Sequence, residues 1–552
     1  MSAQPGPGAT LSSSDPSAGE AFDMVIVGAG FAGLYMLHKA RQLGLRARVF
    51  EAGDGVGGTW YWNRYPGARC DIESMEYSYQ FSDDLQQQWH WTERFAPQPE
   101  ILKYANHVAD RFDLRRDIRF GARVTAASYD EAAARWTVRT ERGDVATGQF
   151  VIMATGCLSS TNMPRFEGLD SFKGARYHTG EWPHEPVDFT GQRVGVIGTG
   201  SSAIQAIPII AKQAKSLTVF QRTANYSVPA RNAPLDPAYE TRIKAEYAAF
   251  RARNSLMPAG FGSNYPRNEV SVFSATPEER QRAFDARWQR GGLGFNGAFN
   301  DLMIDKAAND FAVQYVHERI REVVKDPAVA ALLSPKQVLG CKRICVDTGY
   351  YETFNQPHVK LVDISQGGIE SITPAGVNAA GQSFEFDSIV FATGFDAMTG
   401  TLMKMDIRGR NGLTLREAWS AGPRTYLGLN VAGFPNLFTI SGPGSPSVLT
   451  NMIVSIEQHV NWIADCVGWL RKQGRRSIEA QPQAQDEWVG HVNGVANGTL
   501  YPTCNSWYLG ANVPGKTRVF MPLLGFPPYV ERCSEVVANG YEGFAVGARS
   551  EE

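Results

Sequence analysis

The 552-residue sequence has no long apolar run, no excess of charge of either sign and only seven cysteines. No stretch approaches the roughly 18 apolar residues that a membrane-spanning helix needs, so no membrane association is expected. The net charge of −2 and the lack of a basic run argue against a surface for nucleic acid. Because the cysteines are odd in number and scattered, we expect no disulfide framework and a reducing, cytoplasmic location.

Two local features argue against a metal site and against a signal peptide. Cys341 and Cys345 form a C-x-x-x-C pattern, but no second pair or nearby histidine completes a metal site, so we predict no metal and ordinary buried side chains. Residues 1–22 are rich in Ser, Gly, Pro and Ala and have no apolar core, which indicates a disordered tail and not a signal peptide. The length allows roughly three to four domains, and it does not determine the oligomeric state.

A βαβ pattern follows the tail. Residues 22–27 form an apolar run of strand length, residues 31–43 have helical periodicity, and Gly44 is expected to end the helix. A second strand at 47–50 leads directly into Glu51. This order predicts a parallel, doubly wound sheet.

The turn between the first strand and the helix reads G-x-G-x-x-G, with glycine at 28, 30 and 33. Gly28 permits a tight turn, Gly30 lets the backbone approach a pyrophosphate, and Gly33 allows close packing of helix on strand. The phosphate is expected at the helix N-terminus, where free N–H groups and the helix dipole favour negative charge. Glu51 is placed to accept hydrogen bonds from ribose hydroxyls.

A second unit of the same kind begins with a strand at 193–197 and a loop containing Gly198, Gly200 and Ala203. A helix to about Lys212 and a strand at 216–220 complete it. After that strand come Arg222 and Thr223, where NAD-binding folds hold an acidic residue. A cation and a hydroxyl suit a 2′-phosphate, so we predict NADPH and not NADH.

The segment between the second unit and residue 335 has a different texture, with Ala, Arg, Glu and Gln at helical spacing. Thr276, Pro277 and Glu279 there combine an N-cap, a proline at the first helical position and a capping-box glutamate. We therefore predict a helical insert.

Two further motifs connect these units. One has the spacing F-x-G-x-x-x-H-x-x-x-W-P and comprises Phe172, Gly174, His178, Trp182 and Pro183. The other, G-G-x-W-x-x-x-x-Y-P-G-x-x-x-D, runs from Gly57 to Asp71. With the two glycine loops in this order, the chain resembles the type I Baeyer–Villiger monooxygenases over nearly all of its length after residue 22.

The resemblance implies an α/β fold with two Rossmann-like domains, for FAD and NADP, and a helical insert. The A-T-G strand ends at 154–156 and 392–394 resemble the chain crossings of such flavoproteins and imply discontinuous domains. The expected parts are a disordered tail (1–22), an FAD-binding domain (23–155 and 390–552), an NADP-binding domain (156–225 and 336–389) and the helical insert (226–335).

The resemblance also implies a reaction in which NADPH reduces FAD, O2 gives a C4a-peroxyflavin, and a ketone becomes an ester or lactone. Arg343 corresponds to the family's active-site arginine, a cation that does not titrate, with Asp71 orienting it and Lys342 assisting. Ile344 and Cys345 follow this pair where many members have Pro-Pro or Pro-Leu, which leaves the rigidity of the loop open. A simpler interpretation of Asp71 is a helix cap for residues 72–77.

Other residues receive roles in the same way. His178 is expected to couple domain rotation to catalysis without acid–base work, and Trp182 to pack the linker. A long helix is expected to start near Ser447, with its N-terminus toward the flavin; the turn formers at 491–498 lead to a loop that closes over NADP with Trp507 as its cover. The residues expected to bind the two cofactors are Gly28, Gly30, Phe31, Ala32, Gly33, Glu51, Thr59, Trp60, Asp71, Tyr77, Met452, Thr199, Gly200, Ser201, Ser202, Gln205, Arg222, Thr223, Lys342, Arg343 and Trp507.

Three other functions remain as alternatives. A related flavin monooxygenase would oxidise nitrogen or sulfur, although Trp182 and Pro183 after the histidine favour the Baeyer–Villiger branch. A pyridine-nucleotide disulfide reductase shares the double fold, but the C-x-x-x-x-C expected beside its flavin is missing. A redox-inactive nucleotide sensor would keep both loops. The sequence leaves the identity of the ketone, whether cyclic, aryl or steroid, open.

Overall fold

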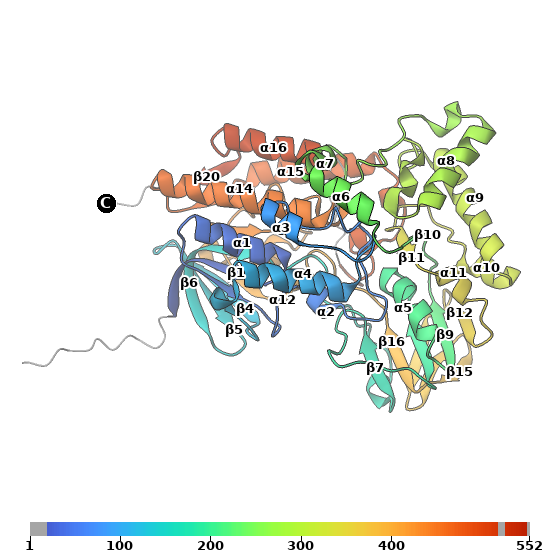
Figure 1. Cartoon of the computed structure of the whole chain (residues 1–552). Helices are drawn as coiled ribbons and strands as arrows, with labels where there is room; N and C mark the ends of the chain where they lie inside the picture. The colour runs from blue at the N-terminus through green and yellow to red at the C-terminus, as the bar shows by residue number, and fades with distance from the viewer. Residues whose placement is uncertain (1–18, 517–524, 549–552) are drawn as a thin grey trace, which may run out of the picture.

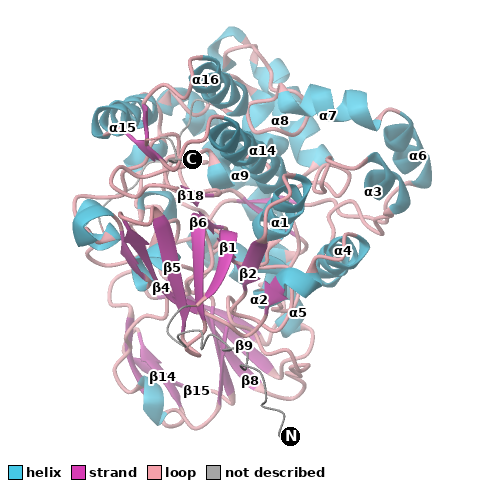
Figure 2. Ribbon diagram, turned by 90° about the vertical axis from the view of Figure 1, so that its left-hand side faces the viewer, coloured by secondary structure: helices cyan, strands magenta, loops and turns pink. Residues whose placement is uncertain are grey.

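Two separate sheets form the framework of the protein in the computed structural model, which describes residues 19–516 and 525–548 (Figure 1). The larger sheet has eight strands and the smaller has five. Figure 2 shows the larger sheet beneath helices α1 and α14, with strands of the smaller sheet below it. The predicted α/β class with two dinucleotide-type units and a helical insert is confirmed.

The larger sheet is built on β1, which pairs in parallel with β2 on one side and β6 on the other. Its strands are β1 (Glu20–Val27), β2 (Ala47–Phe50), β3 (Ile118–Arg119), β4 (Val124–Asp130), β5 (Arg135–Thr140), β6 (Val145–Met153), β17 (Asp406–Arg408) and β18 (Leu437–Thr439). Because β1 begins at Glu20, the tail predicted for 1–22 is too long by the residues that pair with β6; residues 1–18 lie outside the described part.

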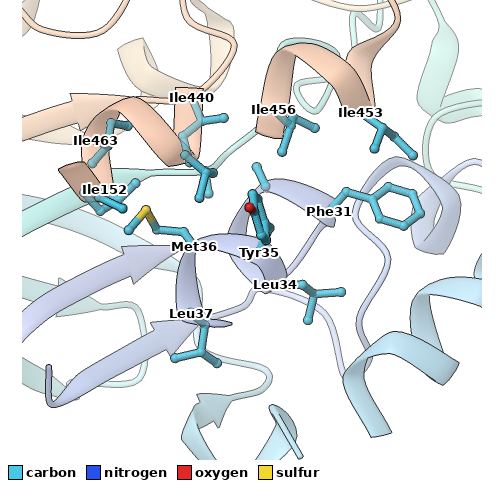
Figure 3. Packing of buried hydrophobic residues seen from close by; sticks show 14 of the residues in the cluster. Phe31, Leu34, Tyr35, Met36, Leu37, Ile152, Ile440, Ile453, Ile456 and Ile463 are labelled. Atoms are coloured by element: carbon cyan, nitrogen blue, oxygen red, sulfur yellow. The ribbon is translucent and has the colours of Figure 1, made fainter. Parts of the chain in front are cut away.

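Helices α1 (Phe31–Gln42) and α14 (Met452–Lys472) pack together above this sheet. Figure 3 shows Phe31 and Tyr35 on the side of α1 that faces Ile453 and Ile456 of α14. These side chains are buried, and the Tyr35 hydroxyl also donates a hydrogen bond to Asn461 Oδ1 at 2.8 Å. Burial of apolar surface at roughly 25 cal/mol per Å² therefore joins segments that are far apart in the sequence.

The long helix was predicted to start near Ser447, and that prediction is wrong. Residues Ser447–Leu449 form a single 3₁₀ turn, and Thr450 is extended with φ −126° and ψ 173°. The side chain of Asn451 then accepts a hydrogen bond from the Ile453 N–H and caps α14. Because an N-cap residue satisfies one of the free amides of the first turn, the helix begins at Met452.

The smaller sheet has the strand order β12-β9-β8-β16-β7 and is entirely parallel. Its strands are β7 (Ala175–His178), β8 (Arg193–Ile197), β9 (Ser216–Gln221), β12 (Val359–Asp363) and β16 (Ser388–Phe391), and helix α5 (Ser201–Ala211) follows β8. The predicted boundary between residues 389 and 390 cuts β16, whose four residues all pair with β8. The chain therefore leaves this sheet after Phe391.

The later part of the helical insert packs in the same apolar core as the smaller sheet, through Phe284, Phe295 and Tyr315. Its first part, with Ile243, Tyr247 and Phe250, packs in the core that also holds α1 and α14. The insert contains α6 (Pro237–Ala245), α7 (Tyr247–Ser255), η3 (Val272–Ser274), α8 (Pro277–Arg290), η4 (Leu293–Ala298), α9 (Lys306–Val323) and α10 (Pro327–Leu333), and β10 (Ser227–Pro229) leads into it. The capping box predicted at Thr276 and Glu279 is present at the start of α8.

The remaining elements connect or cover these parts. They are α2 (Thr59–Trp62), α3 (Asp83–Gln88), α4 (Gln98–Arg111), η1 (Arg115–Asp117), η2 (Leu169–Ser171), β11 (Cys345–Asp347), α11 (Tyr350–Thr353), β13 (Ile369–Thr373), β14 (Gly376–Ala379), β15 (Gln382–Glu385), α12 (Gly400–Lys404), η5 (Arg410–Gly412), α13 (Leu415–Ala418), η6 (Ser447–Leu449), β19 (Ile478–Ala480), α15 (Pro482–Asn497), η7 (Tyr501–Thr503), η8 (Trp507–Leu509), α16 (Phe526–Ala538) and β20 (Phe544–Val546). Residues 491–497 belong to α15 and not to a loop, since Trp488, Val492 and Ala496 bury one face of a helix there. Among residues 19–516 and 525–548, no helix is long and apolar enough to cross a bilayer.

Candidate active site

A cavity of about 1580 Å³ is lined by residues from both sheets, from the helical insert and from the C-terminal third. Nearly all the residues predicted to bind cofactors line it: Gly28, Gly30, Phe31, Ala32, Glu51, Thr59, Trp60, Asp71, Tyr77, Thr199, Gly200, Ser201, Ser202, Gln205, Arg222, Thr223, Lys342, Arg343, Met452 and Trp507. Gly33 does not, because it lies behind the loop; a Cβ there would be 1.8 Å from the Gly28 carbonyl oxygen.

The first glycine loop has the geometry that a pyrophosphate requires. Gly28 has φ +104°, and a Cβ on it would lie 2.5 Å from the Ala154 carbonyl oxygen, so the tight turn needs glycine. Gly30 is the N-cap residue of α1, and no side chain caps that helix. Its free amides therefore remain available to an anion in the cavity.

Glu51 is the acid at the end of β2 and is buried, with 5% of its surface exposed. Its two carboxylate oxygens accept hydrogen bonds from the Ala29 N–H at 2.6 Å and the Gly53 N–H at 2.8 Å. Burial raises the pKa of Glu51, and the backbone bonds oppose that shift. Each oxygen has a further lone pair, and Glu51 lines the cavity, which fits a ribose hydroxyl as donor.

The segment with the G-G-x-W motif lies against the first loop. Gly58 has φ +54°, and a Cβ on it would meet the Gly30 Cα at 2.9 Å. Trp60, in α2, donates its indole N–H to the Tyr77 hydroxyl at 3.1 Å, and both rings line the cavity. Residues 72–77 form no helix, so the cap interpretation of Asp71 is wrong.

The second glycine loop repeats the first in outline. A Cβ on Gly198 would lie 2.4 Å from the Ala392 carbonyl oxygen, whereas a Cβ on Gly200 would meet nothing within 4 Å. Gly200 thus leaves space directly at the N-terminus of α5, where a second pyrophosphate fits. The Thr199 hydroxyl donates to the Thr223 carbonyl at 2.9 Å and holds this loop to the end of β9.

Lys342 and Arg222 both line the cavity. Burial lowers the pKa of Lys342, and the neighbouring charge of Arg222 lowers it further. Two cations that repel each other in this way form a favourable site for a group with two negative charges. Thr223 lines the same part of the cavity wall.

Arg343 and Asp71 form an ion pair, with Nη2 3.1 Å from Oδ2, although 272 residues separate them in the sequence. The other oxygen of Asp71 accepts from the Gln205 amide at 3.3 Å, and Gln205 accepts from the Tyr65 hydroxyl at 2.7 Å. This network joins the β11 loop to α5 and to the G-G-x-W segment. The Arg343 side chain retains 29% of its surface, which faces the cavity, while Asp71 retains 6%.

The electrostatics of this pair keep the arginine charged. Burial lowers the pKa of Arg343, but Asp71 and its hydrogen bond outweigh burial and raise that pKa above its ordinary value. Burial raises the pKa of Asp71, and Arg343 is the main group opposing the shift. The site therefore presents a fixed positive charge to the cavity.

His178 does not line the cavity, and neither do the other linker-motif residues, namely Phe172, Gly174, Trp182 and Pro183. His178 ends β7, where Nδ1 accepts from the Gly180 N–H at 3.0 Å and Nε2 lies 3.2 Å from the Thr393 hydroxyl. Burial lowers the pKa of His178, and because Nδ1 accepts a hydrogen bond, the neutral ring has its proton on Nε2. Thr393 in turn donates to the Asn162 carbonyl, so the histidine connects the strand to both chain crossings.

Tyr508 and Ser441 are among the cavity residues that the sequence did not predict. Tyr508 is buried in a cluster with Cys157 and Met398, beside Arg343, and the predicted Trp507 packs against it with ring centroids 4.4 Å apart. Ser441 has φ +57°, and its buried hydroxyl has no partner within the described residues. A tyrosine or serine carries no local signal of such a position, because burial at this site comes from segments far away in the sequence.

The prediction that all seven cysteines are free is wrong for two of them. Cys341 and Cys504 form a disulfide, with 6.1 Å between their Cα atoms, while Cys70, Cys157, Cys345, Cys466 and Cys533 are free and buried. The two cysteines of the C-x-x-x-C pattern are not bonded to each other, because the partner of Cys341 lies 163 residues away. Counting and spacing of cysteines cannot reveal such a pair.

Comparison with known proteins identifies the family. The family model described as pyridine nucleotide-disulphide oxidoreductase matches residues 25–259. A Baeyer-Villiger monooxygenase of Pseudooceanicola batsensis is 44% identical over 531 residues, covering 95% of this chain and 96% of that protein. The structure titled oxidized steroid monooxygenase bound to NADP has a TM-score of 0.91 and 52% identity, covering 96% of this chain and 99% of that one.

A further structure, titled OTEMO complex with FAD and NADP, has a TM-score of 0.92 and 39% identity, covering 96% of this chain and 100% of that one. Two such cofactors fit the two glycine loops and the cavity that joins them. The resemblance to the family and the expected cofactors, FAD and NADPH, are confirmed. The chain belongs to the Baeyer–Villiger monooxygenases and is an FAD- and NADPH-dependent enzyme that inserts one oxygen atom next to a ketone carbonyl.

Proposed function

We propose that this enzyme oxidises an apolar ketone whose carbonyl lies against Arg343, and that Asp71 holds the guanidinium in place. The observation that carries this proposal is the buried ion pair at 3.1 Å, located where residues of both glycine loops line one cavity. Phe261, Leu293 and Leu449 also line this cavity, and they offer an apolar surface to the rest of the substrate.

The larger sheet is the proposed FAD-binding part and the smaller sheet the proposed NADP-binding part. Support comes from the C-terminal third: Met452 and Ile456 of α14 line the cavity from the side of the larger sheet. The proposed boundaries are those predicted from the sequence, with the first moved back to the start of β1 and the last moved past β16, so that 20–155 and 392–552 bind FAD. Residues 156–225 and 336–391 bind NADP, and 226–335 form the insert; of these ranges, 517–524 and 549–552 lie outside the described residues.

When bound, the flavin receives electrons from NADPH and activates O2. Arg343 supports oxygen transfer by stabilising the negative charge that develops on the ketone oxygen during attack on its carbonyl carbon. A guanidinium suits this task because it stays protonated throughout and presents several donors in a fixed plane. Asp71, through its bonds to Arg343 and Gln205, is a positioning residue that restricts where these donors point.

Lys342 is proposed to act with Arg222 and Thr223 on the 2′-phosphate of NADPH and not as an assistant of Arg343. Support comes from the position of both cations in the wall of one cavity, where the charge of Arg222 lowers the pKa of Lys342 and a bound phosphate would offset it. His178 is proposed to hold the linker to the chain crossings, consistent with its two neutral hydrogen bonds. Trp507, half-buried at the cavity wall, is proposed to cover the nicotinamide nucleotide.

The test is a panel of cyclic, aryl and steroid ketones with FAD-saturated protein, run with NADPH and with NADH and with products identified by mass. An ester or lactone from at least one apolar ketone, with NADPH strongly preferred, is expected. A protein that instead oxidises only amines or sulfides, or that consumes NADPH with no change on adding any ketone, would contradict the proposal.

A further inference from the structure

The disulfide between Cys341 and Cys504 joins two segments that both line the cavity. Cys341 directly precedes Lys342 and Arg343, two of the cations that line the cavity. Cys504 directly precedes a stretch, here called the cover segment (residues 505–516), from which Asn505, Trp507, Tyr508, Ala511 and Asn512 line the cavity. The crosslink therefore connects the active-site loop to the segment that covers it.

The cover segment is otherwise held on the side of the two chain crossings by contacts that are weaker than a covalent bond. The Asn512 amide donates to the Phe395 carbonyl at 2.7 Å, and the Asn162 amide donates to the Asn512 carbonyl at 3.2 Å. Lys516 forms an ion pair with Asp396. Hydrogen bonds and an ion pair of this kind stabilise by about 1 kcal/mol each, and the burial of Tyr508 and Leu509 adds to them. The segment therefore opens locally, at a free-energy cost below that of global unfolding.

We propose that Cys341 and Cys504 are a reversible thiol/disulfide site that sets how firmly the cover segment closes the cavity. In the disulfide form the segment is tied to the Lys342–Arg343 loop, and in the dithiol form it opens on its remaining contacts. This site is distinct from the oxygen-transfer chemistry, in which neither cysteine takes part.

The two sulfur atoms differ in access, which suits reversible chemistry. Cys341 is fully buried, whereas Cys504 is half-buried. A small thiolate attacks the Cys504 sulfur, forms a mixed disulfide there and releases the Cys341 thiolate, which the adjoining Lys342 and Arg343 favour as a leaving group. A second small thiolate then frees Cys504, so two electrons reduce the protein disulfide while two small thiols become one small disulfide; formation is the reverse, with a small disulfide as oxidant.

The first experiment establishes the crosslink. The FAD-loaded protein is equilibrated with glutathione and its disulfide at several ratios, trapped with N-ethylmaleimide and digested without reduction. A linked peptide containing Cys341 and Cys504 is expected under oxidising ratios and should disappear under reducing ones and in Cys504→Ser. Absence of the linked peptide at every ratio would overturn the proposal, as would a linked peptide that no reducing ratio cleaves in the folded protein.

The second experiment measures closure by amide hydrogen exchange of the same holoenzyme. Reduction of the wild type is expected to speed exchange in the peptide covering 507–513 by about tenfold, since a tied segment opens less often. Cys504→Ser, a conservative change at a half-buried position, should show the fast rate whether oxidised or reduced. Cys466→Ala, in the buried face of α14, removes a free thiol elsewhere and should keep the redox dependence.

Equal exchange rates in the oxidised and reduced wild type would refute the switch even if the linked peptide exists. Loss of the redox dependence in Cys466→Ala would also count against it, because that thiol has no part in the crosslink. Neither measurement involves turnover, so a failure to oxidise ketones would contradict the proposed function and leave this inference standing. NADP⁺ dissociation, followed in the same samples, should be several-fold faster in the reduced form.

Discussion

Replacing Asp71 by asparagine removes the negative charge that faces Arg343 but keeps the size of the side chain. The carboxylate accepts from Arg343 at 3.1 Å and from Gln205 at 3.3 Å, and asparagine has only one carbonyl oxygen for the two donors. Arg343 stays charged and keeps 29% of its side-chain surface in the cavity, so water shields it and the fold should survive. The expected loss is in the orientation of the guanidinium.

A hydrogen bond to a charged group contributes about 1.5–3 kcal/mol when its partner is buried. At about 1.36 kcal/mol for each factor of ten, this corresponds to a fall of about 10- to 150-fold. The loss should appear in kcat for ester formation, because the oriented cation acts on charge that develops during the reaction. NADPH oxidation without ketone should change much less, since Asp71 lies next to Arg343 and not next to Arg222.

The assay compares ester formed, measured by mass, with NADPH consumed, for protein whose FAD content is verified from its absorbance. Glu93→Gln is the matched control, because Glu93 pairs at 2.8 Å with Arg69, another arginine that lines the cavity. The control should retain activity within about threefold, as expected when a partly exposed ion pair is broken. If Asp71→Asn makes ester at the wild-type rate, or if Glu93→Gln loses as much as Asp71→Asn, the proposed role of Asp71 is wrong.

Three further outcomes are expected. Gly28→Ala places a Cβ 2.5 Å from a backbone carbonyl oxygen at φ +104°, so the melting temperature should fall and FAD should be lost. Gly200→Ala, whose Cβ meets nothing within 4 Å, should leave the melting temperature unchanged and weaken NADPH binding. Arg222→Ala and Lys342→Ala should each lower the NADPH-to-NADH ratio of kcat/KM by about 10-fold or more, and an unchanged ratio would contradict the phosphate site. Burial raises the pKa of Glu457 from its ordinary value of 4.5 to about 7, so between these two pH values the folded protein holds a proton that the unfolded chain releases. The free energy of unfolding should therefore fall with rising pH in this range, by up to about 1.4 kcal/mol per pH unit. Glu457→Gln should flatten this slope in urea unfolding measured from pH 5 to 8.

Much of the framework could be predicted because its signals are local. The strands at 47–50 and 193–197, the helix after Gly200 and the capping box at Thr276 all appear at the predicted places. An apolar run next to a glycine turn determines its own backbone conformation, whatever surrounds it. The start of α14 was misplaced because the asparagine cap at 451 lies several residues after a turn that looks like a helix start.

The sequence by itself determined that two dinucleotides bind, since tight turns at Gly28 and Gly198 depend on a residue without a side chain. Only the tertiary structure decided that Arg343 meets Asp71 across 272 residues, that Lys342 and Arg222 line one cavity, and that the sulfur atoms of two distant cysteines are bonded. These pairings arise where separate elements pack against one another, and no short-range pattern encodes which surfaces will come together. Short sequence motifs therefore predict which residues carry the chemistry, whereas the contacts between those residues depend on the packing of the whole chain.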